Sequence, residues 1–170
     1  IYQTLIRDYP ASSQTVMAHF QLGETYRSLR RYADAVKAYQ TTIAYPTQDQ
    51  YLADGYTDSF ADQAQFRIGR VHYEDQRYDD ALAAFQEFIT NRSHSPRLAA
   101  AYIYIAHISH ERNDSKGAQH AYNQAMSLVI SSPIQAEMVI DEAHEFGFQE
   151  TDSMAVIQHL EELRKRVKAE

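Results

Sequence analysis

One spacing of residues occurs three times along the chain and constrains its fold more than any other feature. A small residue is followed twelve positions later by alanine and, four positions after that, by an aromatic residue. Two small residues at this separation let two antiparallel helices approach closely, and the aromatic ring fills the space beside them. The spacing predicts three consecutive helix hairpins. The sets are Gly23, Ala35 and Tyr39; Gly69, Ala81 and Phe85; and Ala106, Ala118 and Tyr122.

This pattern resembles the tetratricopeptide repeat (TPR) family over about residues 1–130. The stretch from Tyr73 to Phe85 carries the resemblance most fully, whereas the third repeat has Ala106 in place of the first glycine. The resemblance implies an all-α fold, a right-handed α-solenoid of helix hairpins that ends in a C-terminal capping helix pair. It also implies a curved surface that holds other proteins and has no chemistry of its own.

The hairpin spacing divides a single TPR-like domain, residues 1–170, into segments. Residues 1–10 match the end of a partial repeat, which indicates a piece of a longer chain. Gly23 and Gly69 lie 46 residues apart, more than a repeat of about 34 residues, so an insert is expected. We assign 13–46 to repeat 1, 47–57 to the insert, 58–95 to repeat 2, 96–131 to repeat 3 and 132–170 to a closing helix pair.

The ends of the helices follow from local signals. Turns between paired helices are expected at residues 30–32, 75–77 and 113–115, and Ser132-Pro133 is typical of a helix start. The last helix, to about residue 168, has a narrow apolar stripe with charges elsewhere, as a cap over the exposed end of a repeat array would have. A partner-binding or coiled-coil helix is the alternative.

Composition excludes several classes of function. A net charge of −7 argues against nucleic-acid binding, which depends on neutralising phosphates with Lys and Arg. No apolar run approaches the ~20 residues that span a bilayer, so no direct membrane insertion is expected. The absence of cysteine excludes disulfides and leaves the compartment open.

The resemblance implies that the first helix of each pair lines a concave groove, which would be the partner-binding surface. Three groove positions are apolar and would form a row suited to spaced apolar anchors of a ligand. Arginine and histidine beside this row favour an acidic or C-terminal segment as ligand. In the alternative reading the row packs between repeats and the charges are solvated. The groove residues are Met17, Phe20, Glu24 and Arg27; Gln63, Phe66, Arg70, Tyr73 and Glu74; and Ile103, His107 and His110.

Aromatic residues in and beside the insert are further candidate contacts, because exposed loop aromatics are typical binding anchors. These are Tyr51, Tyr56 and Phe60. The motif His110-Glu111 with Asp114 resembles a zinc motif with its last ligand changed, but Asp114 falls in a turn and no third ligand is indicated. We therefore expect no metal, no cofactor, no catalytic residue and no enzymatic activity.

The expected function is a non-enzymatic scaffold that binds a protein or peptide partner. A regulatory or substrate-binding domain of a larger enzyme, and a self-assembly module that associates through the truncated N-terminal end, are the alternatives. Two phrases, residues 5–12 and 84–89, resemble the bacterial envelope branch, which includes the Tol–Pal-associated TPR protein and outer-membrane assembly lipoproteins. That resemblance implies a periplasmic or outer-membrane-associated protein, with the cytoplasm as the alternative.

Overall fold

A computed structural model describes Tyr2, Thr4 and residues 13–45 and 58–146. These residues form seven α-helices and no strand, which confirms the all-α prediction. The chain divides into two compact units, Ile1–Ser95 and Pro96–Glu170, and each is described by itself. The partial repeat at 1–10 apart from Tyr2 and Thr4, the insert with Tyr51 and Tyr56, and the last helix of the closing pair lie outside the described residues.

Unit 1 contains two helix hairpins. α2 (Ser13–Ser28) pairs with α3 (Tyr32–Ala44), and α4 (Phe60–Glu74) pairs with α5 (Tyr78–Asn91). α4 also packs against α3, so the two hairpins share one core. The helices end within two residues of the expected turns at 30–32 and 75–77.

The close approach of the paired helices depends on glycine. A Cβ atom on Gly23 would lie 2.5 Å from the ring of Tyr39, and one on Gly69 would lie 2.8 Å from the ring of Phe85. Both rings are completely buried. The predicted packing is therefore present in both hairpins of unit 1, with the aromatic ring directly over the glycine.

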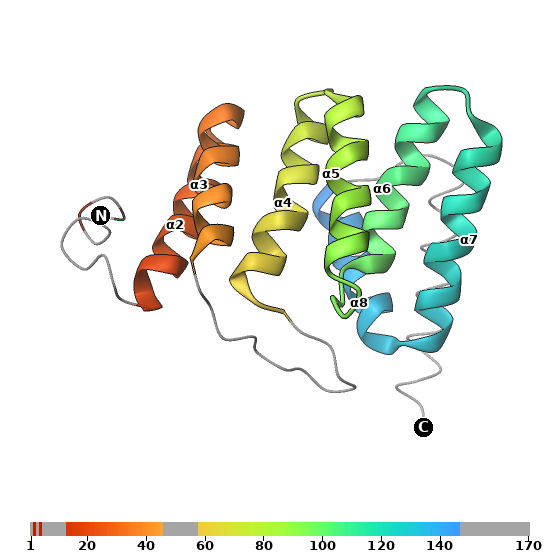
Figure 1. Cartoon of the computed structure of the whole chain (residues 1–170). Coiled ribbons are helices and arrows are strands. Elements are labelled where there is room, and N and C mark those ends of the chain that lie inside the picture. The colour runs from red at the N-terminus through yellow and green to blue at the C-terminus, as the bar shows by residue number, and fades with distance from the viewer. Residues whose placement is uncertain (1, 3, 5–12, 46–57, 147–170) are drawn as a thin grey trace. The chain divides into compact units, whose positions relative to one another are not determined.

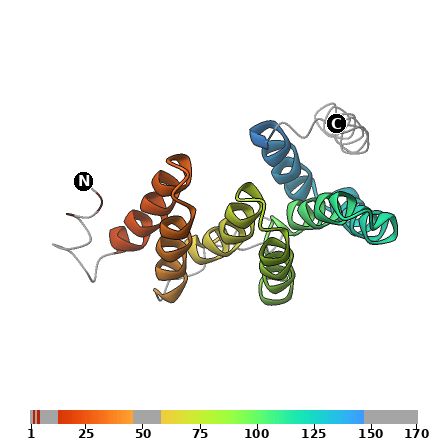
Figure 2. The ribbon, with the colours of Figure 1, turned by 90° about the horizontal axis from the view of Figure 1, so that it is seen from above.

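Unit 2 contains α6 (Leu98–Glu111), α7 (Ser115–Ser131) and α8 (Pro133–Phe146). α6 and α7 form the third predicted hairpin, with Ala106 completely buried and Ala118 buried. α8 contacts both helices, and Figure 2 shows it (blue) extending away from the α6–α7 pair. At the start of α8, the Ser132 hydroxyl accepts a hydrogen bond from the Gln135 N–H at 3.4 Å, as the Ser132-Pro133 signal predicts.

The three hairpins reverse direction in the same way. One residue in each turn has a positive φ: Arg30 (56°), Gln76 (58°) and Asn113 (58°). The N–H of the following residue donates to a carbonyl five residues back, for example from Arg77 to His72 at 2.9 Å. This is the Schellman arrangement, which satisfies carbonyls that the end of a helix leaves without partners.

In the second hairpin of unit 1, polar contacts connect the start of α4 to the end of α5. Asp62 and Ser59 form a capping box at the start of α4, with Asp62 N–H donating to Ser59 Oγ at 3.1 Å and Ser59 N–H to Asp62 at 3.2 Å. The other carboxylate oxygen of Asp62 lies 3.0 Å from Arg92, the residue that follows α5. Arg92 also donates to Gln65 of α4 at 2.8 Å, so the two ends of the hairpin are held side by side.

Candidate functional site

The apolar row predicted for the groove lies in the core. Phe20 is 6% exposed, Phe66 0% and Ile103 4%. The Phe20 ring packs between Tyr39 and Phe60, with centroids 5.7 and 5.5 Å away. The expectation that these three side chains form an apolar row open to a ligand is therefore wrong. Neighbouring side chains cover them, in agreement with the alternative that the row packs between repeats.

Phe60 differs from its expected place in a loop. It is the first residue of α4, is half-buried and contacts Phe20. Its ring is thus part of the contact between the two hairpins of unit 1, rather than an anchor on a free loop.

The charged groove residues of unit 1 form one network between the first helices of the two hairpins. Arg27 of α2 donates to Glu74 of α4 at 2.8 Å, and its other terminal nitrogen lies 3.1 Å from Glu24. Arg67 of α4 lies 3.2 Å from Glu24. Arg70 lies 3.3 Å from Glu74. Two carboxylates and three guanidinium groups thus connect α2 to α4, and four of the five side chains are 15–23% exposed.

Two features make this network more than a surface cluster. The Tyr39 hydroxyl, from the core of the first hairpin, donates a hydrogen bond to Glu24. Burial and then the charge of Glu24 raise the pKa of Tyr39 above its ordinary value. Burial alone would lower the pKa of Arg27, but the Glu24 and Glu74 carboxylates outweigh it and the pKa of Arg27 is raised. The network is therefore anchored to the core through Tyr39, and its Arg27 guanidinium stays charged near neutral pH.

Arg70 is not available to a ligand as the sequence pattern suggested, because its side chain is only 1% exposed. Arg67 and Tyr39, which the groove prediction did not include, take part in the network instead. Arg67 is three residues before Arg70, one helical turn away, and its place opposite Glu24 depends on how α2 and α4 pack.

The other candidates in unit 1 are more accessible. Met17 is 45% exposed on α2, and Gln63 and Tyr73 are half-buried on α4. Gln63 donates to the Asp58 carboxylate at 3.2 Å, and the Tyr73 ring packs against Tyr78 at 5.7 Å.

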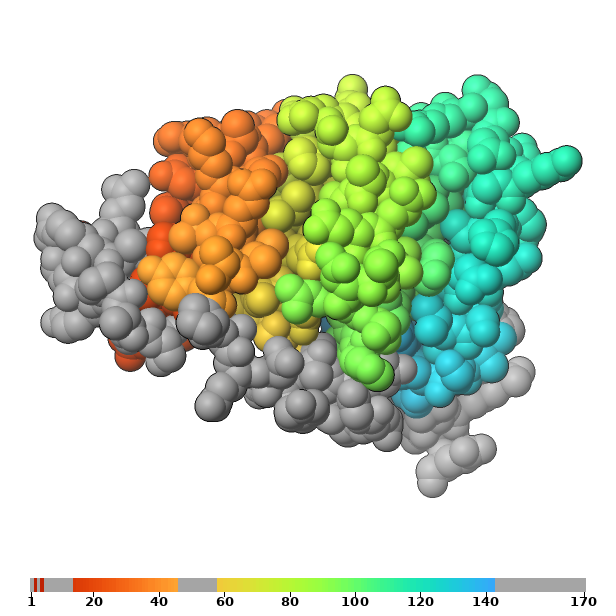
Figure 3. All heavy atoms as spheres, viewed as in Figure 1, coloured from red at the N-terminus to blue at the C-terminus, as the bar shows by residue number. Residues whose placement is uncertain are grey.

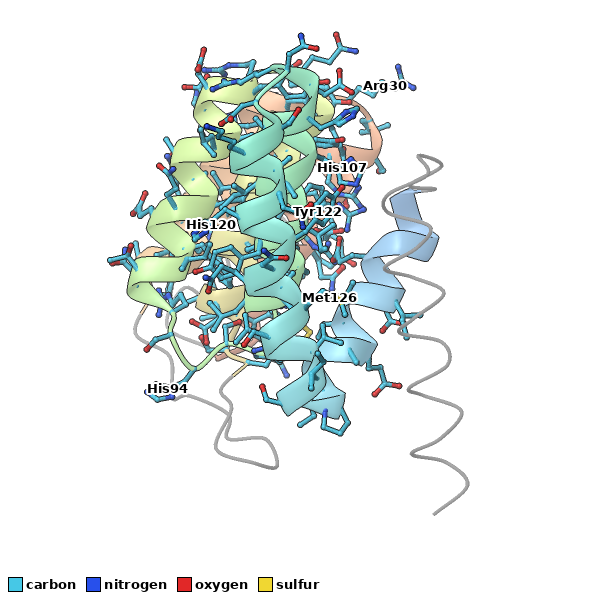
Figure 4. All side chains as sticks on the ribbon, turned by 90° about the vertical axis from the view of Figure 1, so that its right-hand side faces the viewer. Arg30, His94, His107, His120, Tyr122 and Met126 are labelled. Carbon is cyan, nitrogen blue, oxygen red and sulfur yellow. The ribbon has the colours of Figure 1, made fainter. Side chains whose placement is uncertain are left out.

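In unit 2, His107 is buried and His110 is exposed. Burial, and then the charge of His110, lower the pKa of His107 to about 4, although Glu111 acts in the opposite direction. The His107 ring meets Tyr122 of α7 edge-on at 6.4 Å. In Figure 4, His107 and Tyr122 lie on the side of α7 where α8 runs, and His120 lies on the other side.

Two polar contacts hold α8 on α6, and the sequence pattern did not predict them. The Tyr104 hydroxyl donates to Glu142 at 3.1 Å, and the Ala99 N–H donates to the Gln135 side-chain oxygen at 2.8 Å. All four residues are at most 4% exposed. A signal was present, because Gln135 and Glu142 interrupt the apolar side of α8, but their partners depend on tertiary packing.

The second helices of unit 1 present a different surface. Figure 3 shows the face of α3 (orange) and α5 (green). The exposed side chains of these helices include Lys37 and Gln40 on α3 and Gln86, Glu87 and Thr90 on α5. This polar surface resembles an ordinary solvated helix face and provides control positions for tests of the α2–α4 face.

Among residues 13–45 and 58–146, no group of three or more His, Asp or Glu side chains is arranged to hold a metal ion. Within the same described ranges, no helix has the length and apolar character needed to cross a bilayer.

The repeated hairpins, their glycine–aromatic packing and their common turn define a class of helical-repeat proteins. A model of the tetratricopeptide repeat family matches residues 1–49 and 20–96, which together make up more than half of the chain. The chain belongs to the tetratricopeptide repeat family. No curated protein matches it.

Solved structures share this fold at low sequence identity. A crystal structure of MamA is 15% identical, with a TM-score of 0.57, and the match covers 99% of this chain and 88% of MamA. PcrH in complex with the chaperone binding region of PopB is 17% identical, also with a TM-score of 0.57, and covers 75% of this chain and 91% of PcrH. A second MamA structure, MamA MSR-1 C2, is 20% identical with a TM-score of 0.52 and covers 75% and 63% of the two chains.

Proposed function

We propose that this chain is a non-enzymatic protein-interaction module and that unit 1 binds a segment of a partner across α2 and α4. The observation that carries this proposal is the Glu24–Arg27–Arg67–Arg70–Glu74 network on the first helices of two successive hairpins. Membership of the tetratricopeptide repeat family supports it, as does PcrH, a protein of similar fold whose structure contains a bound region of PopB.

The network suits recognition because its side chains are already ordered. Arg27 and Arg67 are 17% and 16% exposed and are held by carboxylates on the opposite helix. A ligand that contacts them does not have to restrict freely rotating side chains, a cost of about 0.5–1.5 kcal/mol for each. The guanidinium groups of Arg27 and Arg67 are partly exposed and donate hydrogen bonds most strongly to carboxylates, which favours an acidic segment.

An apolar contact is available on the same side of α2 as Glu24, two helical turns earlier. Met17 is 45% exposed on α2 and is flexible enough to fit ligands of different shape. The proposed ligand is therefore a short segment with acidic side chains and one apolar anchor.

Site-specific photo-crosslinking tests this proposal. A photoreactive amino acid is placed at Met17 and, in a separate protein, at Lys37 of α3, which is exposed on the second-helix surface. In extract of the source cells, Met17 is expected to give a defined adduct that Lys37 does not give. The captured protein is then purified, and its affinity for the unlabelled chain is measured.

Matched substitutions identify the contact. Met17→Ala is expected to weaken binding of the captured partner about five- to tenfold, as for removal of an apolar anchor. Ile130→Ala removes an equally apolar side chain that is 67% exposed on α7 and should leave affinity unchanged. Adducts from Lys37 alone would place the interaction on the second helices, and adducts of the chain with itself would favour the self-assembly alternative.

A narrower proposal concerns the cellular compartment of this module. The phrases at residues 5–12 and 84–89 support a scaffold of the bacterial envelope, in the periplasm or at the outer membrane. Fractionation of source cells with an antibody against this chain tests it. Recovery of the whole protein in the cytoplasmic fraction would exclude the envelope assignment and leave the binding proposal intact.

A further inference from the structure

The way α8 is attached to α6 points to a second binding surface. At one end of the contact, the Gln135 side chain accepts a hydrogen bond from the Ala99 N–H at 2.8 Å. At the other end, Glu142 accepts one from the Tyr104 hydroxyl at 3.1 Å. The four residues are at most 4% exposed. Both contacts thus lie inside the interface, where water does not compete with them.

The two acceptors occupy one side of α8. Gln135 and Glu142 are seven residues apart, about two helical turns, so they project from the same side. Between them on this side lies Val139, which is 3% exposed. α8 therefore offers α6 a buried apolar side chain with a hydrogen-bond acceptor on either side of it, the pattern of a helix that docks in a groove.

α6 offers the complementary groups. Its N-cap residue, Arg97, makes no side-chain cap, and the first N–H groups of a helix have no partner within it. Gln135 supplies an acceptor to one of them, at Ala99. Tyr104, just over one turn further along α6, supplies a donor. This face of α6 therefore donates hydrogen bonds to two positions of the helix bound to it, in addition to making apolar contacts.

The arrangement differs from the packing between hairpins in unit 1. There, α4 packs mainly on α3, the second helix of the preceding hairpin, whereas α8 contacts α6 at least as much as α7. The residues of α6 that the TPR pattern assigns to a ligand, Ile103 and His107, are 4% and 5% exposed. In unit 2, α8 thus packs on the first helix, the helix from which TPR proteins are expected to bind their partners.

We propose that this face of α6 is a helix-binding surface that α8 occupies in cis, and that a partner helix binds by displacing α8. The partner is an amphipathic helix with side-chain acceptors at two positions seven residues apart and an apolar residue between them on the same side. The proposal concerns unit 2 alone and does not depend on binding across α2 and α4.

A peptide of residues 132–146 serves as the probe. The fluorescein-labelled peptide is titrated, by fluorescence anisotropy, with the unaltered chain and with a Gln135→Ala/Glu142→Ala chain. The substitutions weaken the cis helix and leave α6 unchanged, so the substituted chain should bind the peptide at least tenfold more tightly. A control peptide with the same two substitutions should bind at least tenfold more weakly than the unaltered peptide.

A third variant locates the site. Adding Tyr104→Phe to the substituted chain removes one donor from α6 and should reduce peptide affinity about threefold or more. Equal affinity of the peptide for the unaltered and substituted chains, or no effect of Tyr104→Phe, would place peptide binding elsewhere and overturn the proposal.

If the double substitution prevents folding, hydrogen exchange is measured on the Tyr104→Phe chain instead. This single substitution keeps the aromatic ring and removes only the hydroxyl that donates to Glu142. The amides of α8 should then exchange faster while those of α7 keep their protection. Joint opening of α7 and α8 in one step would make α8 an inseparable part of unit 2 and contradict the proposal.

Discussion

Unit 1 and unit 2 build the same hairpin with different contacts. In unit 1 the aromatic ring lies over a glycine, and Tyr39 and Phe85 are completely buried. In unit 2 the glycine is replaced by Ala106, and Tyr122 is only half-buried. An added Cβ in unit 1 would lie within 3 Å of the ring, so a ring cannot occupy the same place over alanine. A single methyl group thus changes where the aromatic side chain of a repeat can lie.

The contacts to the next helix differ as well. In unit 1 the first helices α2 and α4 are connected by ion pairs among two carboxylates and three guanidinium groups. In unit 2 the contact of α6 with α8 uses a tyrosine hydroxyl and a backbone N–H as donors. The repeat sequence therefore fixes the hairpin, while the interactions beyond it are specific to each unit.

The largest expected effect is on the ionic contact of unit 1. Glu74→Ala removes the carboxylate that Arg27 and the buried Arg70 contact. Breaking a buried pair from one side costs about 3 kcal/mol, and we expect this decrease in the free energy of unfolding. Urea denaturation followed by circular dichroism measures it. Glu87→Ala, at an exposed position of α5, is the control and should change stability by less than about 0.5 kcal/mol.

The glycine–aromatic packing gives the next largest effect. Gly69→Ala forces a methyl group against Phe85, which is completely buried and cannot move aside. Overpacking of this kind costs about 2–3 kcal/mol. The reverse change, Ala106→Gly, should cost only about 1 kcal/mol from lower helix propensity. Equal costs in thermal unfolding of the two variants would mean that the ring and the methyl group do not compete for space.

The buried histidine of unit 2 predicts a larger dependence of stability on pH than the histidines of unit 1, His19 and His72, whose pKa values burial also lowers. The folded pKa of His107 is about 4, against a usual 6.5, so the unfolded chain takes up a proton first as pH falls. Stability from this residue is present above pH 6.5 and is lost between pH 6.5 and 4, by about 2 kcal/mol at pH 5. Urea titrations at pH 7.5 and pH 5 measure it, and His107→Gln should reduce the pH dependence by this amount.

The turns give the smallest expected effect. Arg30 and Gln76 have positive φ values of 56° and 58°, which disfavour residues with a Cβ, whereas Asn113 at 58° tolerates this conformation. Arg30→Gly and Gln76→Gly should each stabilise the protein by about 0.5–1 kcal/mol. Asn113→Gly should change stability by less than about 0.3 kcal/mol. Thermal unfolding of the three variants compares the turns directly, and a larger gain at Asn113 would contradict this explanation.

For the three hairpins that the structure describes, the sequence was sufficient to predict the helices and their turns, because the same spacing sets each hairpin. The predicted turn at residues 113–115 and the observed helix ends at Glu111 and Ser115 illustrate this agreement. The signal is local in each case, since small residues and an aromatic residue recur at fixed distances within about 20 positions.

The surroundings of the groove positions were not predictable in the same way. Periodicity places Phe20 and Phe66 on a defined side of a helix, but burial depends on which neighbour covers that side. The same applies to Arg70, whose spacing suits a ligand contact but which is almost completely buried. Contacts over long sequence distances, such as Arg27 with Glu74, 47 residues apart, leave no trace in local spacing.

The double role of Asp62 has a consequence for how the second hairpin opens. Its carboxylate caps the first turn of α4 and also binds Arg92, beyond the last residue of α5. Fraying at either terminus of this hairpin therefore weakens the other, and α4 and α5 should lose amide protection together, as a single cooperative element. Asp62, which its local motif identifies only as part of a helix cap, thus also stabilises the end of the next helix, 30 residues later in the chain.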